Sequence, residues 1–489
     1  MKFTTGFKDD QDGESHILQL FSEGVSCHPV YQVLSMLKHF PLFSALLILA
    51  SCSHRESDDG SWVHDEVQTR IDKQVRWFQG RPEDLEAQSA IQAMLKHDLT
   101  VDTAVQVALL NNPSLQATFE EIGIAEADLI QAGLLKNPVF DGYVRFPNPS
   151  SEVINTQFSV VFGFLDIFMV PLRKKAARTH FQRAKSLVAD SVLKLAAQVE
   201  QAFYSYQAQL AQIDLQRLVV DALEVSFEVA DRQFQAGNVN ALFVEQKKID
   251  WDQEIATLEG MILESEIKYE ELSCLLGLES DNSHWTVTSA LEDIPPHDPS
   301  IEELEDLALG QRFDVLAARQ EVLVIAQVGA QKKWWAYTDA LVGVSYEREA
   351  DGTRELGPSW ELAIPLFNYG QADRHRLRSQ LNQSKQNLKA LELDVRCAVN
   401  VAEQKMATAR AIAESYASQI LPETKEVLET GQRMYNVMAY GVYDLLDNKM
   451  QEVEPLMNYE MALRDYWIAR AEMERAIGGK VPSYQAELE

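Results

Sequence analysis

Cysteine and basic residues are both scarce in this sequence. Its 489 residues include four cysteines, which are too few and too scattered for a disulfide framework or a metal cluster. Lys and Arg number 44 against 74 Asp and Glu, a formal charge of −30. Nucleic acid binding requires a basic stripe, so we expect no nucleic acid partner. The acidity fits either simple solubility or a negatively charged conduit.

Enzyme motifs are also lacking. There is no glycine-rich phosphate loop, no HExxH and no CxxC pair, and the ten histidines are scattered. The sequence therefore predicts a protein that is not an enzyme, with no catalytic residue, no bound cofactor and no resident metal.

A short apolar run lies near the start of the chain. The apolar residues 42–49 come after Lys38, and Ala50 and Ser51 then separate them from Cys52. The run is too short to span a bilayer, but it resembles a bacterial lipoprotein signal in which Cys52 becomes the lipidated first residue. Ser53 at the next position suits the outer membrane in that resemblance. We therefore interpret residues 1–51 as an upstream extension and signal, with Met36 as the expected start.

Glycine is absent from residues 371–430, where apolar residues recur in steps of three, four or seven. This spacing is typical of a coiled-coil seam. It predicts one long helix over residues 370–437, about 100 Å in length at ~1.5 Å per residue. A second such rod is predicted over 171–236. The seam consists of Leu377, Leu381, Leu388, Leu391, Val395, Ala398, Ala402, Met406, Ala409, Ile412 and Tyr416.

Each rod is preceded by apolar residues at every second position, which predicts paired strands at 139–146 and 154–164 and at 338–347 and 357–366. Strands of this length suit a tilted bilayer crossing, although a small soluble sheet has the same pattern. Four strands do not close a barrel by themselves. If they cross a membrane, several chains must share one barrel, because unpaired edges are intolerable in lipid.

The elements occur twice at an offset of about 200 residues, which predicts an internal two-fold repeat. The expected organisation is an N-terminal arm at 52–98, a first repeat at 99–279 with its return helix at 242–276, a linker at 280–300, a second repeat at 301–479 with its return helix at 442–477, and a tail at 480–489.

Several short motifs resemble the TolC family of outer membrane efflux proteins: LTVDTA at 99–104, NNPSL at 111–115, IPLFNYG at 364–370, YNV at 435–437 and GVYDLLD at 441–447. The resemblance covers about 99–479. It implies a mainly α fold with a small membrane β-part: a homotrimer with a 12-stranded barrel, four strands per chain, above a coiled-coil tunnel in the periplasm of a Gram-negative bacterium.

The family further implies an exit duct that passively conducts substrates received from an inner-membrane pump through a periplasmic adaptor, or membrane fusion protein. The outer membrane lipid is then a further partner. Two alternatives remain: the exit of a type I protein secretion system, and a periplasmic adaptor or structural coiled-coil lipoprotein. The sequence does not indicate the cargo or the class of pump.

In that resemblance, the turns after the rods form the periplasmic tip. The turn residues are Gly237 and Gly441, and the aperture candidates are Asp444, Asp447, Tyr435 and Tyr440. Asp444 and Asp447 share a helix face, so three copies would stack two carboxylate rings suited to cation selection. The alternative is an ordinary solvated acidic helix end.

Basic residues recur where each rod begins, at Arg173 and Lys175 and again at Arg374 and Arg376. They oppose the helix macrodipole, so another group should compensate them. Phosphates of the inner leaflet would lie at this level if the strands are in the membrane. A charge network with neighbouring helices is the alternative.

Overall fold

The computed structural model describes residues 60–146, 154–279, 285–288, 290–296, 298, 301–332, 340–349, 351–364 and 366–481. The chain divides into two units, Met1–Ser57 and Asp58–Glu489, and every described residue belongs to the second. The predictions for Cys52, the signal at 1–51 and most of the tail therefore lie outside the described residues.

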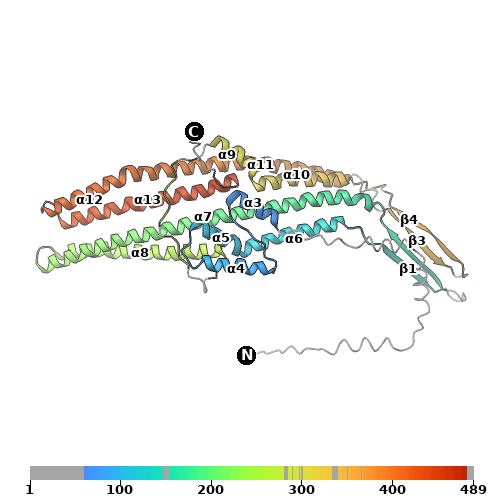
Figure 1. Cartoon of the computed structure of the whole chain (residues 1–489), viewed down its shortest axis with the longest axis horizontal. Helices are drawn as coiled ribbons and strands as arrows, with labels where there is room; N and C mark the ends of the chain where they lie inside the picture. Colours follow the sequence, from blue (N-terminus) through green and yellow to red (C-terminus); the bar gives the residue numbers. More distant parts are fainter. Residues whose placement is uncertain are drawn as a thin grey trace, which may run out of the picture. The chain divides into compact units, whose positions relative to one another are not determined.

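The second unit is mainly helical with one small sheet, as the sequence predicted, and its elements follow the same order in both halves (Figure 1). The described part of the N-terminal arm forms two helices, α3 and α4. The first half consists of α3 (Ser61–Ile71), α4 (Pro82–Met94), α5 (Val101–Asn111), α6 (Pro113–Gly133), β1 (Val139–Arg145), β2 (Asn155–Phe162), α7 (Asp166–Gln235) and α8 (Ala241–Leu276). The second consists of α9 (Ile301–Gln311), α10 (Phe313–Lys332), β3 (Ala340–Arg348), β4 (Arg354–Leu362), α11 (Gln371–Ser415), the π-helix η2 (Tyr416–Ile420), α12 (Leu421–Asn436) and α13 (Val442–Ile477).

The return helices end against junctions between two short helices: α8 ends at the α5–α6 junction, and α13 ends at the α9–α10 junction. Asn112 caps α6 by accepting a hydrogen bond from the Leu115 amide at 3.1 Å. Gly277 ends α8 with φ of 71°, and a Cβ there would lie 2.7 Å from the Asn111 carbonyl oxygen. Gly478 ends α13 with φ of 79° in the same way, against Arg312 between α9 and α10. Glycine provides both the left-handed backbone and the close approach.

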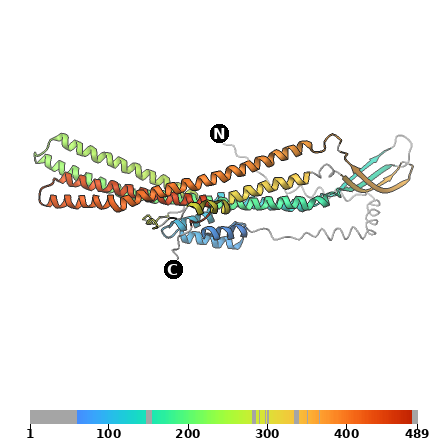
Figure 2. The same ribbon diagram turned by 90° about the horizontal axis from the view of Figure 1, so that it is seen from above.

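Helix α7 is 70 residues long, about 105 Å at ~1.5 Å per residue. It begins at Asp166, five residues before the predicted start, so Pro171 lies inside it. Helix α8 packs along α7, and α13 also contacts α7. The two helical hairpins thus lie side by side (Figures 1 and 2).

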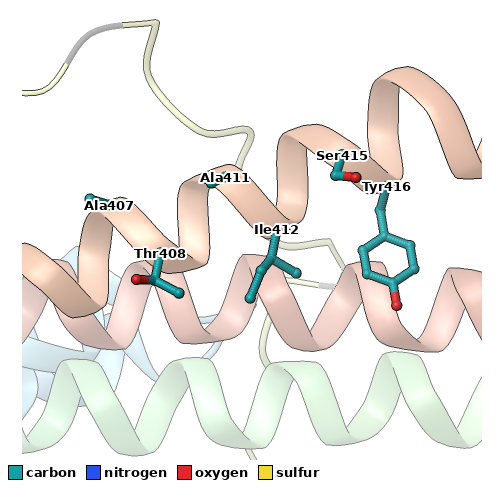
Figure 3. Close-up of a pocket in the computed structure, with 6 residues that line it drawn as sticks. All are labelled: Ala407, Thr408, Ala411, Ile412, Ser415 and Tyr416. Carbon is teal, nitrogen blue, oxygen red and sulfur yellow. The ribbon is translucent and has the colours of Figure 1, made fainter.

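The helix predicted over 370–437 extends from Gln371 to Asn436, but the π-turn η2 interrupts its α-helical hydrogen bonds just before Pro422, a residue that the prediction did not take into account. Proline has no N–H to donate to the carbonyl four residues earlier. The ladder shifts to a π-turn just before it, in which the Leu421 amide donates to the Tyr416 carbonyl. A groove of about 600 Å³ lies along the end of α11 just before this junction and is lined by Ala407, Thr408, Ala411, Ile412, Ser415 and Tyr416 (Figure 3).

The four strands form one antiparallel sheet in the order β1-β2-β3-β4, so the hairpins are joined between β2 and β3. Strand β4 begins three residues and ends four residues earlier than predicted. The reason is a short turn in which Gly352 adopts φ of 91°, so that Arg354 already pairs with Arg348.

Among the described residues, no helix is both long enough and apolar enough to cross a membrane.

The largest core cluster lies where α3, α5, α6, α7, α8 and α13 converge, with Phe119, Phe203 and Tyr466 fully buried. A second cluster joins α9, α11 and α13, and the predicted seam residues Leu388 and Leu391 pack against it. The core therefore holds the long helices at their middle. The sheet lies at one end of these helices and the turns at the other (Figure 2).

Candidate functional site

The turn between α7 and α8 is built from a glycine and a capping asparagine. Gly237 adopts φ of 77°, and the Asn238 amide donates to the Gln233 carbonyl at 2.8 Å, which closes the end of α7. The Asn240 side chain then accepts a hydrogen bond from the Phe243 amide at 2.9 Å and starts α8. The predicted turn residue Gly237 thus occupies the left-handed position.

The turn between α12 and α13 repeats this geometry with a different residue. Met438 takes the left-handed position with φ of 61°, and the Ala439 amide donates to the Met434 carbonyl at 3.0 Å. The predicted Gly441 is instead the residue that precedes α13, with extended backbone at φ of −77°. Met438 thus lies 201 residues after Gly237, and its side chain is 94% exposed.

Met438→Gly is expected to stabilise this turn by about 1 kcal/mol, because the left-handed backbone costs a residue with a Cβ ~1–2 kcal/mol. Gly237→Ala, the matched change in the first turn, should cost a similar amount. Hydrogen exchange of the turn amides measures both changes. Equal exchange in Met438→Gly and the wild type would show that Met438 is not strained.

Tyr443 connects the two hairpins near these turns. Its hydroxyl donates to Oε1 of Gln233 on α7 at 3.1 Å, and its ring meets the Phe243 ring edge-on with centroids 5.2 Å apart. Lys247 lies 5.9 Å above the same ring. Sequence analysis missed this contact. The signal was the aromatic pair at the start of α8 and α13, on matching turns of the repeat.

The predicted aperture residues lie together at the second turn. Asp444 and Asp447 are exposed on the first turns of α13, and Asp444 also accepts a hydrogen bond from the Gly441 amide at 3.1 Å. Tyr435 is 41% exposed. Tyr440 turns back to α13 and accepts a hydrogen bond from Nδ2 of Asn448 at 3.4 Å. The two carboxylates are therefore available to a partner or an ion, while Asp444 also serves as a helix cap.

A groove of about 470 Å³ lies beside this turn, between α12 and α13. Gly431 lets α12 approach Asn448 of α13 closely beside the groove, because a Cβ there would lie 2.6 Å from Nδ2 of Asn448. The lining residues are Glu423, Glu426, Val427, Thr430, Gly431, Met434, Tyr440 and Asn448. The groove combines an acidic rim with an apolar floor, which suits a helix with basic and apolar side chains.

The four predicted basic residues do not form one cluster. Arg173 forms an ion pair with the buried Asp166 at 3.0 Å and donates to the Leu134 carbonyl at 3.1 Å. Arg376 pairs with Asp373 at 3.4 Å, and Arg374 lies over the Tyr369 ring. Lys175 is exposed. Each of these two ion pairs joins residues of one helix, α7 or α11, so neither is a contact between neighbouring helices, and the role of the four basic residues stays a prediction.

A cavity of about 920 Å³ lies near the middle of the long helices, lined by residues from α3, α5, α7, α9 and α13. Glu200 and Glu474 both face it. Burial, followed by the negative charge of Glu474, raises the pKa of Glu200 to about 8. Burial likewise raises the pKa of Glu474. The ionised pair is therefore unfavourable in the folded chain.

This pair predicts a pH dependence of stability. A raised carboxyl pKa makes the folded state hold protons that the unfolded state releases, so stability falls as the pH rises from about 4.5 to about 8. Glu200→Gln should reduce this fall and raise the thermal midpoint at pH 8, with little change at pH 4. Glu224→Gln, at an exposed position on α7, is the control. A fall as steep in Glu200→Gln as in the wild type would contradict the assignment.

Among the described residues, no group of three or more His, Cys, Asp or Glu side chains is arranged to hold a metal ion.

Residues 104–278 match the family model described as outer membrane efflux protein. This part of the chain belongs to the outer membrane efflux protein family. The predicted family membership is thereby confirmed. Cobalt-zinc-cadmium resistance protein CzcC of Cupriavidus metallidurans is 20% identical over 387 residues, which cover 78% of this chain and 90% of CzcC.

Several solved structures of membrane proteins share the fold. A membrane protein from Pseudomonas aeruginosa superposes with a TM-score of 0.63 at 19% identity, covering 79% of this chain and 95% of that one. CusC gives a TM-score of 0.63 at 16% identity, covering 78% and 92%. The open state of the MtrE channel of Neisseria gonorrhoeae gives 0.57 at 15%, covering 78% and 91%. The CusC structures are described in terms of transmembrane channel formation, and MtrE is described as an outer membrane channel.

Proposed function

We propose that three copies of this chain form a passive exit duct in the outer membrane. Each chain would contribute its four strands to a 12-stranded barrel, and the long helices would line a tunnel across the periplasm. The observation that carries the proposal is the sheet itself, in which β1 and β4 are unpaired edges among the described strands. Open edges are not tolerated in lipid, so a neighbouring copy must pair with each of them.

The apolar surface of the sheet supports this assembly. Phe140, Val344 and Trp360 lie on one face and are 68%, 54% and 78% exposed. Exposed apolar area of this kind indicates a membrane or a partner. The seam residue Ile412 is also 45% exposed and lines the groove at the π-turn, where a neighbouring copy would cover it (Figure 3).

We assign the two turns to the periplasmic tip, where an adaptor and an inner-membrane pump would dock. The groove beside the second turn is acidic at its rim and apolar at its floor, so the adaptor would present an amphipathic helical hairpin with basic residues. We assign Asp444 and Asp447 to the aperture and Cys52 to lipid attachment. Lys175 and Arg374 would lie near the inner leaflet.

Divalent metal ions are the cargo to test first, because CzcC is a cobalt-zinc-cadmium resistance protein. A type I protein secretion exit is the nearest alternative, and it differs in requiring passage of an unfolded chain rather than ions. Zn²⁺ resistance of cells with and without the intact gene distinguishes the two. The adaptor alternative is disfavoured by the match to channel structures along most of the chain.

Fractionation with heat-modifiable gel mobility, followed by conductance in planar bilayers, tests the duct. The proposal expects a detergent-extracted oligomer that dissociates on heating and opens a stable pore. A monomer released without detergent would overturn it.

A further inference from the structure

The apolar face of the sheet ends in a pair of arginines. The strand pairings place Phe140, Val160, Val344 and Pro358 in one row across the four strands. The next row towards the β3–β4 turn holds Gly142, Phe158, Tyr346 and Leu356, and the row after it holds Val144, Thr156, Arg348 and Arg354. The apolar face thus changes to a basic edge within one step of the pleat.

Arg348 and Arg354 lie directly opposite each other on β3 and β4. Like charges in this arrangement destabilise a strand pair unless an anion lies between them. In the described part of the chain neither arginine forms an ion pair, and the buried Nε of Arg348 has no hydrogen-bond acceptor. The pair therefore lacks a counter-ion.

The carboxylates nearest in sequence do not fill this role. Glu347 and Glu355 are also directly opposite each other. Because successive side chains of a strand point to opposite faces, they lie on the other side of the sheet from the arginines. The hairpin separates its charges, with a basic pair on the apolar face and an acidic pair on the polar face.

We propose that Arg348 and Arg354 bind the phosphate group of an outer-leaflet lipid. The inference rests on the proposed function, in which the apolar face meets lipid and the β3–β4 turn lies at the outer surface. A guanidinium offers a planar fork of donors that matches phosphate oxygens, and two forks can enclose one phosphate.

The apolar face points to a lipid rather than a free anion. Leu356 and Trp360, which follow Arg354 along β4 on the same face, are 75% and 78% exposed. Acyl chains attached to the bound phosphate would cover both side chains. Leu356 and Leu362 are six residue steps apart along β4, or about 20 Å at ~3.4 Å per residue. At the ~35–45° tilt of outer-membrane strands, this length covers roughly 15 Å of an apolar band that is about 25 Å tall.

The test compares Arg348→Gln/Arg354→Gln with Glu347→Gln/Glu355→Gln, which removes two charges from the adjacent positions of the same strands, on the opposite face. Each purified oligomer is mixed with bis-phosphorylated lipid A or with dephosphorylated lipid A in detergent micelles, and native mass spectrometry counts the bound lipid. We expect the wild type and the glutamate variant to prefer the phosphorylated lipid. The arginine variant should bind it about tenfold more weakly, because two charge-assisted contacts are lost.

Equal binding of phosphorylated lipid by the arginine variant and the wild type would overturn the inference. Competition by inorganic phosphate at the lipid's own concentration would overturn the assignment to a lipid. Heat-modifiable gel mobility of the same samples shows whether the oligomer has formed, so it distinguishes failure of the lipid site from failure of the proposed duct. If the oligomers form and lipid preference is absent, only the lipid site fails. If no oligomer forms even in the wild type, the proposed function fails and the lipid site with it.

Discussion

Replacing Asp444 and Asp447 together by asparagine is expected to abolish the cation preference of the reconstituted channel. In the proposed trimer, three copies bring six carboxylates to the narrow end of the tunnel, where they attract cations and repel anions. Asparagine keeps the size of each side chain and can still accept the hydrogen bond from the Gly441 amide. The double variant should therefore assemble normally while losing the electric field of the ring.

The measurement is the reversal potential in a salt gradient across a planar bilayer. Glu423→Gln/Glu426→Gln is the control. It removes two exposed carboxylates of the neighbouring helix α12, and these two residues are also three positions apart. Ion selectivity should change in the aspartate variant and be nearly unaltered in the control. If the solvated-helix-end alternative holds, the aspartate variant keeps its selectivity and loses only ~0.3–1 kcal/mol of helix-end stabilisation.

Gly343→Ala is expected to prevent assembly of the β-part. A Cβ at this position would overlap the carbonyl oxygen of Val160 and lie 2.7 Å from Cγ1 of Val161. Both atoms belong to β2, so the added methyl group would separate β2 from β3, where the two hairpins join. The cost should reach or exceed the ~1–3 kcal/mol typical of overpacking, because the backbone itself must move.

Gly357→Ala is the matched control, since Gly357 lies on the same face of β4 and its added Cβ would meet nothing within 4 Å. We expect the heat-modifiable oligomer to be lost in Gly343→Ala and retained in Gly357→Ala. Normal oligomer yield in Gly343→Ala would contradict the β2–β3 pairing.

The features that could be predicted from the sequence are those set by a repeating pattern. Alternation along β1 and β3 and the seam along α11 each involve many residues, so one exception does not hide them. Single residues with a backbone role were harder to predict. Pro422 shifts the ladder into a π-turn, and Met438 takes a position that sequence reasoning gave to a glycine.

The site was predicted only where its residues are close in sequence. Asp444 and Asp447 could be placed on one helix face from their spacing. The contact of Tyr443 with Gln233 joins residues that are 210 positions apart, and the ion pair of Arg173 depends on where α7 begins. Such contacts depend on the relative positions of whole helices, which local spacing does not encode.

The most direct measurement of the central claim is electron cryomicroscopy of the full-length protein in lipid nanodiscs. The duct predicts a three-fold symmetric map in which β1 of each chain pairs with β4 of its neighbour, so that twelve strands close one barrel. A single chain with β1 and β4 both unpaired, or a barrel closed by a different number of copies, would contradict it.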